Sequence, residues 1–531
     1  MPQESEKRET DQGQRPRGAV FPIAVIELGT SAIRMAIGET DGQSQVRILE
    51  QLVRGVSLGK DSFTRREIRR DTLRQCVRVL RSYRQKLNEY DCTDPRQIRV
   101  VATSAVREAG NRIAFLDRVY MATRFAVEPI DDAEIARLTY LAIRPLLEQD
   151  PHLRDATTLL MEVGGGNTEV LLLRGRSILH SQSYKLGAIR LRQLIREYRA
   201  SGEHALRLMN GQIDRTLEQL KDVVPQRGSI SLLALGGDVR FAVRALQLEP
   251  GEQGVISVPL SRLQKLTNEL IGLSIEQIMQ RYHLELSEAE TLVPALLVNV
   301  RTAQMLGADR LLVTGFNLRD ALLQGMVRPA DWSPDFRGQI IRSAEELARK
   351  FQVDIEHSRY VAGLAARIFR ALAKSHDLDV RCETILYVAA LLHEAGLFVN
   401  SSGYHKHSYW LISNSEIFGL NSLDHRLTAL VARYHRRATP KASHEAFAAL
   451  ERDSRVIVNR LAGILRVAIG LAQSRTQRIR ELDCRIEEDQ LVLSVHGRGG
   501  DLSLERLELR QHADLFRDVF GLDLILRDSR S

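Results

Sequence analysis

Short apolar runs separated by polar turns begin about twenty residues into the chain. The runs at 23–26, 34–37 and 46–49 are typical of three neighbouring strands in a meander. Apolar residues at helical spacing follow between 66 and 90, and residues 98–102 return to a strand pattern. We therefore expect this part to alternate strands with helices.

A second cycle of the same patterns follows. It comprises a helix around 133–147, strands at 159–161 and 170–173, helices at 189–199 and 209–223, and strands at 231–235 and 311–314. Alternation of this kind predicts α/β layers. Two cycles within about 300 residues suggest duplicated subdomains that face each other across a cleft.

The pattern changes after Pro329 and Pro334, which mark the clearest linker, at 328–334. The stretches 344–373 and 384–397 have helical spacing, and strand signals return only at 484. The end of the chain combines strand patterns at 484–486, 491–495 and 522–526 with a helix at 509–520. A helical domain followed by a small α+β module is expected.

A glycine-rich turn carries the strongest chemical signal. Gly164, Gly165 and Gly166 follow a strand that ends in Glu162-Val163, and Asn167-Thr168-Glu169 comes next. Glycines lack a Cβ, so a phosphate can approach their backbone N–H groups. A similar strand, acid and turn recur at 23–31, with Glu27 in the place of the acid. One such turn alone fits an ordinary hairpin, whereas two in matching contexts favour a shared phosphate site.

These turns belong to a series of motifs that resembles one known family, the exopolyphosphatase and guanosine pentaphosphate phosphohydrolase (Ppx/GppA) family. The resemblance covers about residues 21 to 440, in order. Its segments are 26–34, 102–111, 134–138 and 162–169, with weaker echoes at 185–191, 234–238 and 315–320 and a later run at 391–408.

The resemblance implies an α/β fold of two actin-like ATPase lobes of the sugar kinase and ribonuclease H-like type, followed by an HD-like all-α domain and a small α+β module. The expected bounds are a disordered tail at 1–20, phosphatase subdomain I at 21–140, subdomain II at 141–328, the HD-like domain at 335–475 and the C-terminal module at 476–531.

The activity that the resemblance implies is Mg²⁺-dependent release of terminal phosphate from inorganic polyphosphate or guanosine pentaphosphate. Such cleavage needs an oriented water, a base and cations that offset phosphoryl charge. Glu134 matches the first Glu of the family's Glu-Glu-Ala-Arg-Leu motif and is the expected base. Spacing alone favours another interpretation, a helix residue paired with Arg137 three positions on.

Glu27 and Glu162 stand where the family carries Asp, and together with Glu134 they form the expected catalytic set. The expected Mg²⁺ ligands are Glu27, Glu162 and Glu169. A Glu is one methylene longer than Asp, and Mg²⁺ tolerates little misplacement. The alternative is therefore a weak or inactive protein that senses polyphosphate or guanosine alarmones. A sugar-kinase-like transferase would need an acceptor, for which no signal is found.

The resemblance also implies a set of phosphate-binding residues, since guanidinium forks and backbone N–H groups suit phosphate. These are Gly29, Thr30, Ser31, Arg34, Arg107, Gly165, Gly166, Asn167, Gly236 and Gly237. Asp238 departs from the small hydroxyl residue that the family prefers there.

The HD-like segment offers histidines in roughly the order of an HD phosphohydrolase, namely His357, His393-Glu394 and His435. The pair is His-Glu and a final Asp ligand is missing, so we expect structural or ligand-guiding use rather than a working metal centre. Two basic clusters flank them, His405-Lys406-His407 and Arg433 with 435–437. A polyanion leaving the cleft would pass favourably over such a surface, and a solvated basic face fits as well.

The composition limits the partners, the localisation and the cysteine chemistry that we expect. The 531 residues carry 75 Lys+Arg against 67 Asp+Glu, a net charge of +8, which favours polyanionic partners. No apolar block reaches the length of a membrane span, and the N-terminus lacks a signal-peptide core. We expect a cytoplasmic protein with no membrane partner, polyphosphate or guanosine pentaphosphate rather than nucleic acid as its ligand, and a homodimer by resemblance. The four cysteines are scattered, which argues against disulfides or a Cys-type zinc site.

Overall fold

The structure is a computed structural model of the chain. It describes residues 20–41, 46–151, 153–199, 201–225, 228–250, 254–327, 332, 334–436, 438–496 and 502–528. The expected tail before residue 20, most of the expected linker at 328–334, and Arg437 of the second basic cluster lie outside the described residues.

The first lobe is built on a five-stranded sheet in the order β3-β2-β1-β4-β5. Its strands are β1 (Phe21–Leu28), β2 (Ala32–Thr40), β3 (Arg47–Gly55), β4 (Ile98–Ala102) and β5 (Val127–Pro129). The first three form the predicted antiparallel meander, and β4 then pairs with β1 in parallel. The short β5 was not predicted from the sequence.

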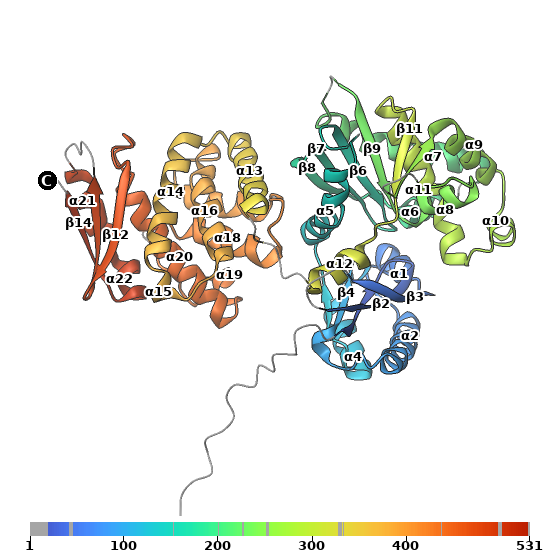
Figure 1. Ribbon diagram of the computed structural model, residues 1–531, viewed down its shortest axis with the longest axis horizontal. Coiled ribbons are helices and arrows are strands. Elements are labelled where there is room, and N and C mark those ends of the chain that lie inside the picture. Colours follow the sequence, from blue (N-terminus) through green and yellow to red (C-terminus); the bar gives the residue numbers. More distant parts are fainter. Residues whose placement is uncertain are drawn as a thin grey trace, which may run out of the picture.

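The second lobe repeats this topology in a six-stranded sheet, β10-β11-β9-β6-β7-β8. Its strands are β6 (Thr157–Val163), β7 (Thr168–Arg174), β8 (Ser177–Tyr184), β9 (Ile230–Leu235), β10 (Val255–Pro259) and β11 (Arg310–Thr314). Again three strands form a meander, and β9 joins β6 in parallel. The expected duplication is therefore present in the strand order itself, as Figure 1 shows with the first lobe below the second.

Helices cover the two sheets. They are α1 (Leu58–Arg65), α2 (Arg70–Glu89), α3 (Ser104–Arg107), α4 (Arg112–Thr123), α5 (Asp132–Gln149), α6 (Ala188–Glu197), α7 (Gly202–Lys221), α8 (Gly237–Ala245), α9 (Leu260–Ile271), α10 (Ile275–Tyr282), α11 (Leu286–Met305) and α12 (Leu318–Val327). A short 3₁₀ turn covers Pro95–Gln97.

The last of these helices crosses back to the first lobe. Leu318, Leu322 and Leu323 of α12 are buried together with Val25 of β1 and Leu138 of α5. The two lobes are therefore tied by α5 and α12, and the sequence-based boundary at 140/141 falls inside α5.

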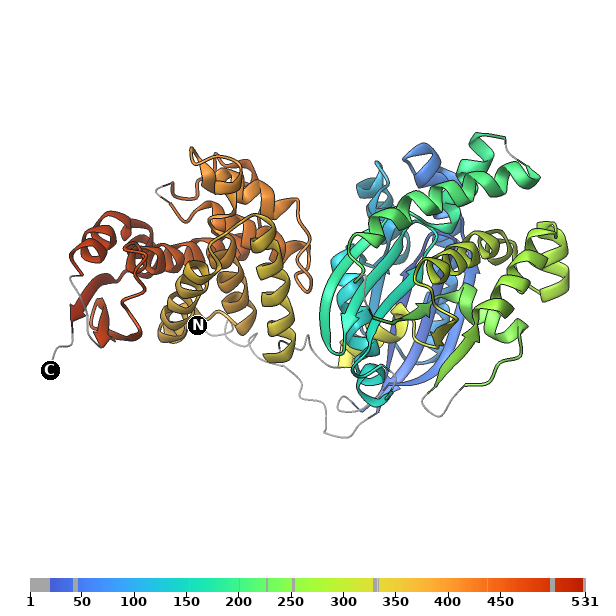
Figure 2. The same ribbon diagram turned by 90° about the horizontal axis from the view of Figure 1, so that it is seen from above.

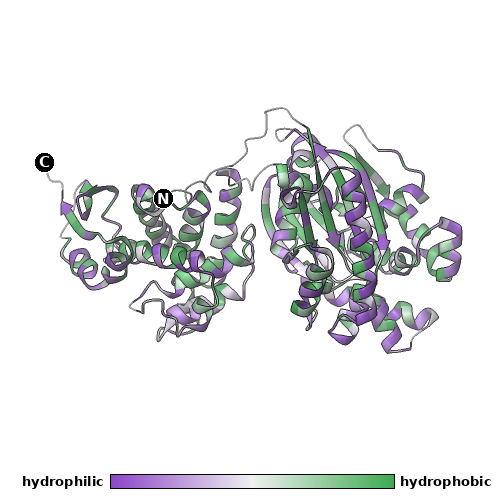
Figure 3. Cartoon of the chain, turned by 90° about the horizontal axis from the view of Figure 1, so that it is seen from below, coloured by the Kyte–Doolittle hydropathy of each residue, from purple (hydrophilic) through white to green (hydrophobic). Residues whose placement is uncertain are grey.

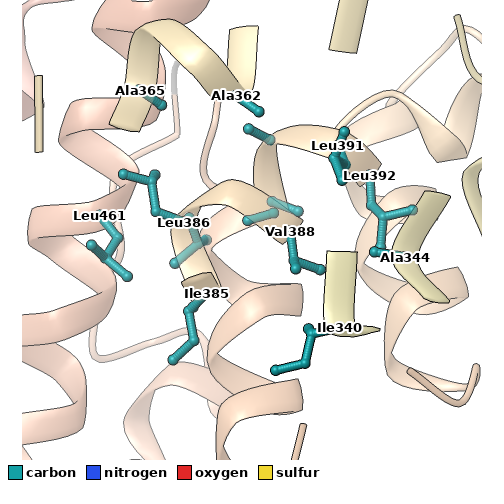
Figure 4. Close-up of a cluster of buried hydrophobic side chains, with 14 of the residues drawn as sticks. Ile340, Ala344, Ala362, Ala365, Ile385, Leu386, Val388, Leu391, Leu392 and Leu461 are labelled. Carbon is teal, nitrogen blue, oxygen red and sulfur yellow. The ribbon is translucent and has the colours of Figure 1, made fainter. Parts of the chain in front are cut away.

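The third part is helical, with a core in which side chains from α13, α14, α16 and α20 meet (Figure 4). Its helices are α13 (Pro334–Lys350), α14 (Ile355–Ala371), α15 (Ala373–His376), α16 (Val380–Leu392), α17 (Tyr404–Ser413), α18 (Ser422–Arg433), α19 (Glu445–Ala448) and α20 (Arg452–Leu471), with a 3₁₀ turn at Ala395–Phe398. The stretch expected to be helical from 344 to 373 is interrupted at Gln352, whose φ of 53° is left-handed.

The helical part packs on the second lobe, as seen from above in Figure 2. Gln339 of α13 bridges the gap: its side chain accepts from the backbone N–H of Ile178 at 3.1 Å and donates to the carbonyl of Arg176 at 2.6 Å. Tyr140 of α5 meets Phe418 edge to face, with ring centroids 5.7 Å apart. The helical part therefore contacts α5.

A small sheet closes the chain, with β13 between β12 and β14. Its strands are β12 (Glu481–Glu487), β13 (Gln490–His496) and β14 (Asp523–Asp528), and two helices, α21 (Ser503–His512) and α22 (Asp514–Phe520), replace the single helix expected at 509–520. Figure 3 shows apolar residues along the strands and an alternation of apolar and polar residues along the helices. No helix in the described part of the chain has the length and hydropathy needed to cross a membrane.

Candidate active site

The two glycine turns occupy equivalent positions in the two lobes. In the first lobe Glu27 of β1 lies opposite Arg34 of β2, and in the second lobe Glu162 of β6 lies opposite Glu169 of β7. Directly opposite residues of an antiparallel pair project to the same face. Each lobe thus presents two charged side chains beside its turn.

A cavity of about 360 Å³ lies between these turns. It is lined by most of the predicted site residues, namely Glu27, Gly29, Thr30, Ser31, Arg34, Glu162, Gly165, Gly166, Asn167, Glu169, Gly236 and Gly237. Residues from sequence positions more than 200 apart therefore share one volume, and Glu134 and Arg107 are not part of its lining.

Glycine is required in the second turn because the two lobes touch there. A Cβ on Gly165 would overlap the side chain of Thr30, and one on Gly166 would come within 2.6 Å of Ser104 Oγ. The N–H groups of these two glycines make no hydrogen bond with any residue that the structure describes. They are donors that a phosphate can use.

Glu27 is held by arginines. Its Oε2 accepts from Arg319 Nη1 at 2.5 Å, and Arg34 Nη1 lies 3.8 Å from Oε1. Burial alone would raise the pKa of Glu27, but the charges of Arg34 and Arg319 outweigh it and hold this pKa below its ordinary value. Glu27 is therefore an ionised carboxylate that is already neutralised.

Glu162 is in the opposite situation. Among the described residues its carboxylate has no hydrogen-bond or ion-pair partner, and burial raises its pKa despite the nearby charge of Arg240. An unpaired buried carboxylate is costly, so this position favours a cation as partner.

Glu169 belongs to a short chain of hydrogen bonds. Ser183 Oγ donates to its Oε1 at 2.8 Å, and Asn167 Nδ2 donates to Ser183 at 3.0 Å. Burial and the negative charge of Asp132 hold the pKa of Glu169 well above its ordinary value. A carboxylate with a raised pKa is suited to accept a proton near neutral pH.

The expected base, Glu134, does not face the cavity. Both of its oxygens accept from Arg137, each at 2.7 Å, and Arg99 lies 3.8 Å away. The α5 residues that do line the cavity are Asp132 and Ile135. The pairing with Arg137, which the spacing alone favours, is present, and the assignment of Glu134 as base stays a prediction that rests on the resemblance.

Arg107 likewise does not line the cavity. It donates to the carbonyl of Ile130 at 2.6 Å and to the carboxylate of Asp132. Its contacts fix the start of α5 and the Asp132 carboxylate. Arg107 therefore orients a cavity residue, where direct contact with phosphate was expected.

Six charged residues in the described lining of the cavity had no assigned role from the sequence: Asp132, Asp238, Arg240, Arg244, Glu288 and Arg319. Burial raises the pKa of Asp238 to about 7, and Asn299 donates to it at 2.8 Å. Arg240 lies in the first turn of α8 and Arg319 in the first turn of α12. The sequence could have pointed to Arg240 and Arg319, because each follows directly after a strand and a turn.

The donor set fits Mg²⁺. Hard carboxylate oxygens are its preferred protein ligands, and Glu162 and Glu169 lie opposite each other with Glu162 lacking any described partner. Glu27 fits less well, because both of its oxygens face arginine.

A duplicated pair of lobes with acidic, glycine-containing turns around an arginine-lined cavity defines a phosphate-handling protein of the actin-like ATPase type. Comparison with known families identifies the particular family. The model of the Ppx/GppA phosphatase family matches residues 36–329, and that of Ppx/GppA phosphatase domain III matches residues 341–513. The chain belongs to the Ppx/GppA phosphatase family, which confirms the resemblance found in its sequence.

One solved structure at a TM-score of 0.50 shares this fold. An exopolyphosphatase from Cytophaga hutchinsonii is 22% identical, with a TM-score of 0.50, over 58% of this chain and 97% of that one. The Ppx/GppA family member from Aquifex aeolicus is 20% identical, with a TM-score of 0.47, over 59% of this chain and 100% of that one.

Proposed function

We propose that this chain is a Mg²⁺-dependent phosphoanhydride hydrolase that releases terminal phosphate from inorganic polyphosphate or guanosine pentaphosphate. The observation that carries the proposal is the meeting of both glycine turns with Glu162, Glu169 and four arginines in one cavity. Cleavage of a phosphoanhydride is mostly positioning and charge stabilisation. Both the cations and the carboxylates that it needs are present.

The cationic side chains in the described lining of the cavity are Arg34, Arg240, Arg244 and Arg319, and they would bind phosphoryl oxygens. The free N–H groups of Gly165 and Gly166 would add neutral donors. A substrate phosphate that pairs with Arg319 would compete with Glu27 for this guanidinium. In this scheme Glu27 orients Arg319 and Arg34 and offsets part of their positive charge.

Glu162 would hold Mg²⁺, which supplies charge neutralisation of the transferring phosphoryl group, and Glu169 opposite it would stay outside the metal shell. Glu169 is our choice for the base, in place of Glu134, because its pKa is raised and Ser183 fixes its orientation. The oxygen not bound to Ser183 would take the proton of the attacking water. Asp132 beside it would favour the protonated product electrostatically.

A second candidate function is binding without turnover, as a sensor of polyphosphate or guanosine alarmones. The placement of the apolar Ile135 in the cavity wall, with Glu134 turned to Arg137, favours it. Glu27 bound to Arg319 also removes one expected metal ligand.

Orthophosphate release separates the two functions. The purified chain is incubated with polyphosphate or guanosine pentaphosphate, with Mg²⁺ or with a chelator, and binding is measured in parallel. Hydrolysis predicts Mg²⁺-dependent release that a Glu162→Gln variant loses. Tight binding without release by the wild-type chain would support the sensor and exclude the hydrolase. Light scattering on the same samples tests the homodimer that we carry over from the family.

A further inference from the structure

A second cavity lies between the second lobe and the helical part. Its volume is about 400 Å³, and its described lining comes from β8, from α13 and from residues 414–418. The strand β8 is an edge of its sheet. Cavities of this size hold small-molecule ligands. None of the residues that the sequence pointed to as site residues belongs to this described lining.

This second cavity is separate from the cavity between the lobes. A space of about 10 Å³ adjoins both of them. Asp132 and Glu169 line this space and the first cavity, whereas Glu416 lines this space and the second cavity. Such a space has room for about one water molecule. A larger ligand in the second cavity would therefore stay apart from the glycine turns.

Charged side chains of both signs line the second cavity. They are Glu346 and Lys350 of α13 and Glu416, and all three residues are exposed. Within the described part of the chain, none of the three side chains forms an ion pair or a hydrogen bond. Glu346 and Lys350 stay unpaired although they are four positions apart on one helix, a spacing at which opposite charges often pair. All three charges are therefore available to a ligand.

The acids and the lysine lie toward opposite ends of the cavity. Ser343 of α13 marks one end, because its Oγ accepts a hydrogen bond from the backbone N–H of Phe418 at 3.0 Å. Glu346 follows Ser343 by about one turn, whereas Lys350 stands two turns beyond it, which is about 10 Å along a helix. Glu416 belongs to the same segment as Phe418. The cavity is therefore acidic near Glu416 and basic toward Lys350.

The neighbours of each end agree with this polarity. Burial, and in addition the positive charge of Lys350, lower the pKa of His180, which lines the cavity. Burial, and then the negative charges of Asp132 and Asp131, raise the pKa of Glu416 to about 7. A negative charge on Glu416 is therefore penalised. A cationic group of a ligand beside it would remove that penalty.

Part of the cavity wall is apolar. Ile178 of β8, Leu347 of α13 and Phe418 line the cavity and are buried. An aliphatic group that packs against these side chains gains hydrophobic free energy. A ligand that satisfies the whole lining thus carries an ammonium group, a carboxylate and an aliphatic portion.

We propose that this cavity binds a free α-amino acid with an aliphatic side chain, its ammonium group at Glu416 and Glu346 and its carboxylate at Lys350. A zwitterion suits both ends, whereas phosphate would meet two acids and a simple amine would meet the lysine. Because the ligand would contact both β8 and α13, its binding would stabilise the docking of the helical part on the second lobe. This site is independent of the proposed hydrolysis between the lobes.

L-Leucine serves as the probe in isothermal titration calorimetry of the full-length chain. Two analogues each lack one charge: leucinamide keeps the ammonium group, and 4-methylpentanoate keeps the carboxylate. One equivalent of leucine is expected to bind. Each analogue should bind at least about 10-fold more weakly, since it loses a charge-assisted hydrogen bond. Binding is measured without turnover, so the result does not depend on phosphate release.

Two variants locate the site. Glu416→Gln and Lys350→Met should each weaken leucine binding at least about 10-fold. Glu356→Gln and Lys441→Met change exposed residues of the helical part outside the described lining, and as matched controls they should bind leucine as the wild type does. All four positions are exposed, so the variants should fold, and circular dichroism checks this. Three results would overturn the proposal: no saturable leucine binding, an analogue that binds as tightly as leucine, or leucine binding that either cavity variant leaves unchanged.

Discussion

Glu162 lies opposite Glu169 across the β6–β7 pair, at the position where the first lobe sets Glu27 opposite Arg34. The duplicated fold therefore pairs acid with acid in one lobe and acid with base in the other. This asymmetry concentrates unneutralised negative charge beside the second turn. It makes the β6–β7 pair the side of the cavity that favours a cation.

The pairing of Glu27 with Arg319 is predicted to be strongly coupled. Arg319→Met removes the hydrogen-bonded cation and leaves Glu27 with Arg34 at 3.8 Å, so it should destabilise the chain by about 3 kcal/mol. Glu27→Gln with Arg319→Met should recover much of that loss. Urea unfolding of the single and double variants measures the coupling, and additive effects would refute it.

The same pair predicts a pH dependence. Since the pKa of Glu27 is lowered in the folded chain, its contribution to stability is present above its ordinary pKa of 4.5 and is lost as the pH falls through the folded value. The slope of unfolding free energy against pH below about 5 should be smaller in Glu27→Gln. An unchanged slope would contradict the assignment.

Gly165→Ala should push the lobes apart. The added methyl overlaps Thr30, so the cost should be about 1–3 kcal/mol in stability and, through misplacement of about 1 Å, on the order of 100-fold in phosphate release. Gly211→Ala, an exposed helix glycine with open space around its Cα, is the matched control and should be slightly stabilising. Equal behaviour of the two variants would show that the lobes do not need this close contact.

Asp424 in the helical part gives a pH effect of opposite sign. Burial raises its pKa from 3.8 to about 6, although Arg381 lies 3.0 Å away. The stability that its neutral form contributes is complete below about pH 4 and is lost as the pH rises through 6. Each pKa unit corresponds to about 1.4 kcal/mol, so Asp424→Asn should gain about 3 kcal/mol relative to the wild type between pH 4 and pH 8. Thermal unfolding at both pH values checks this, and a constant difference would contradict it.

The sequence predicted more of the fold than of the candidate site. Strand and helix periodicity predicted the first meander, two strands of the second and the duplication, because the apolar runs of β1, β6 and β9 are buried on both faces. It missed β5, β8 and β10. The first of these is three residues long and the second is rich in Ser, His and Gln. Such strands are set by their neighbours in the sheet.

The site was predicted best where backbone chemistry dictates the residue. The glycine turns and their flanking acids were found because a close approach leaves little choice of side chain. The roles of Glu134 and Asp132 could not be separated in the same way, because which of them faces the cavity depends on how α5 is rotated by its packing against α12 and Phe418. That rotation is set by tertiary packing, and a match with a family motif does not predict it.

The central claim is that Glu169, and not Glu134, acts as the base. Phosphate release by two Glu→Gln variants tests it most directly. Wild type, Glu169→Gln and Glu134→Gln are compared on polyphosphate and guanosine pentaphosphate with Mg²⁺. Our account predicts that Glu169→Gln loses about 100-fold or more in rate while still binding substrate, and that Glu134→Gln remains active with lower stability. Loss of activity in Glu134→Gln alone, with Glu169→Gln as fast as the wild type, would contradict it.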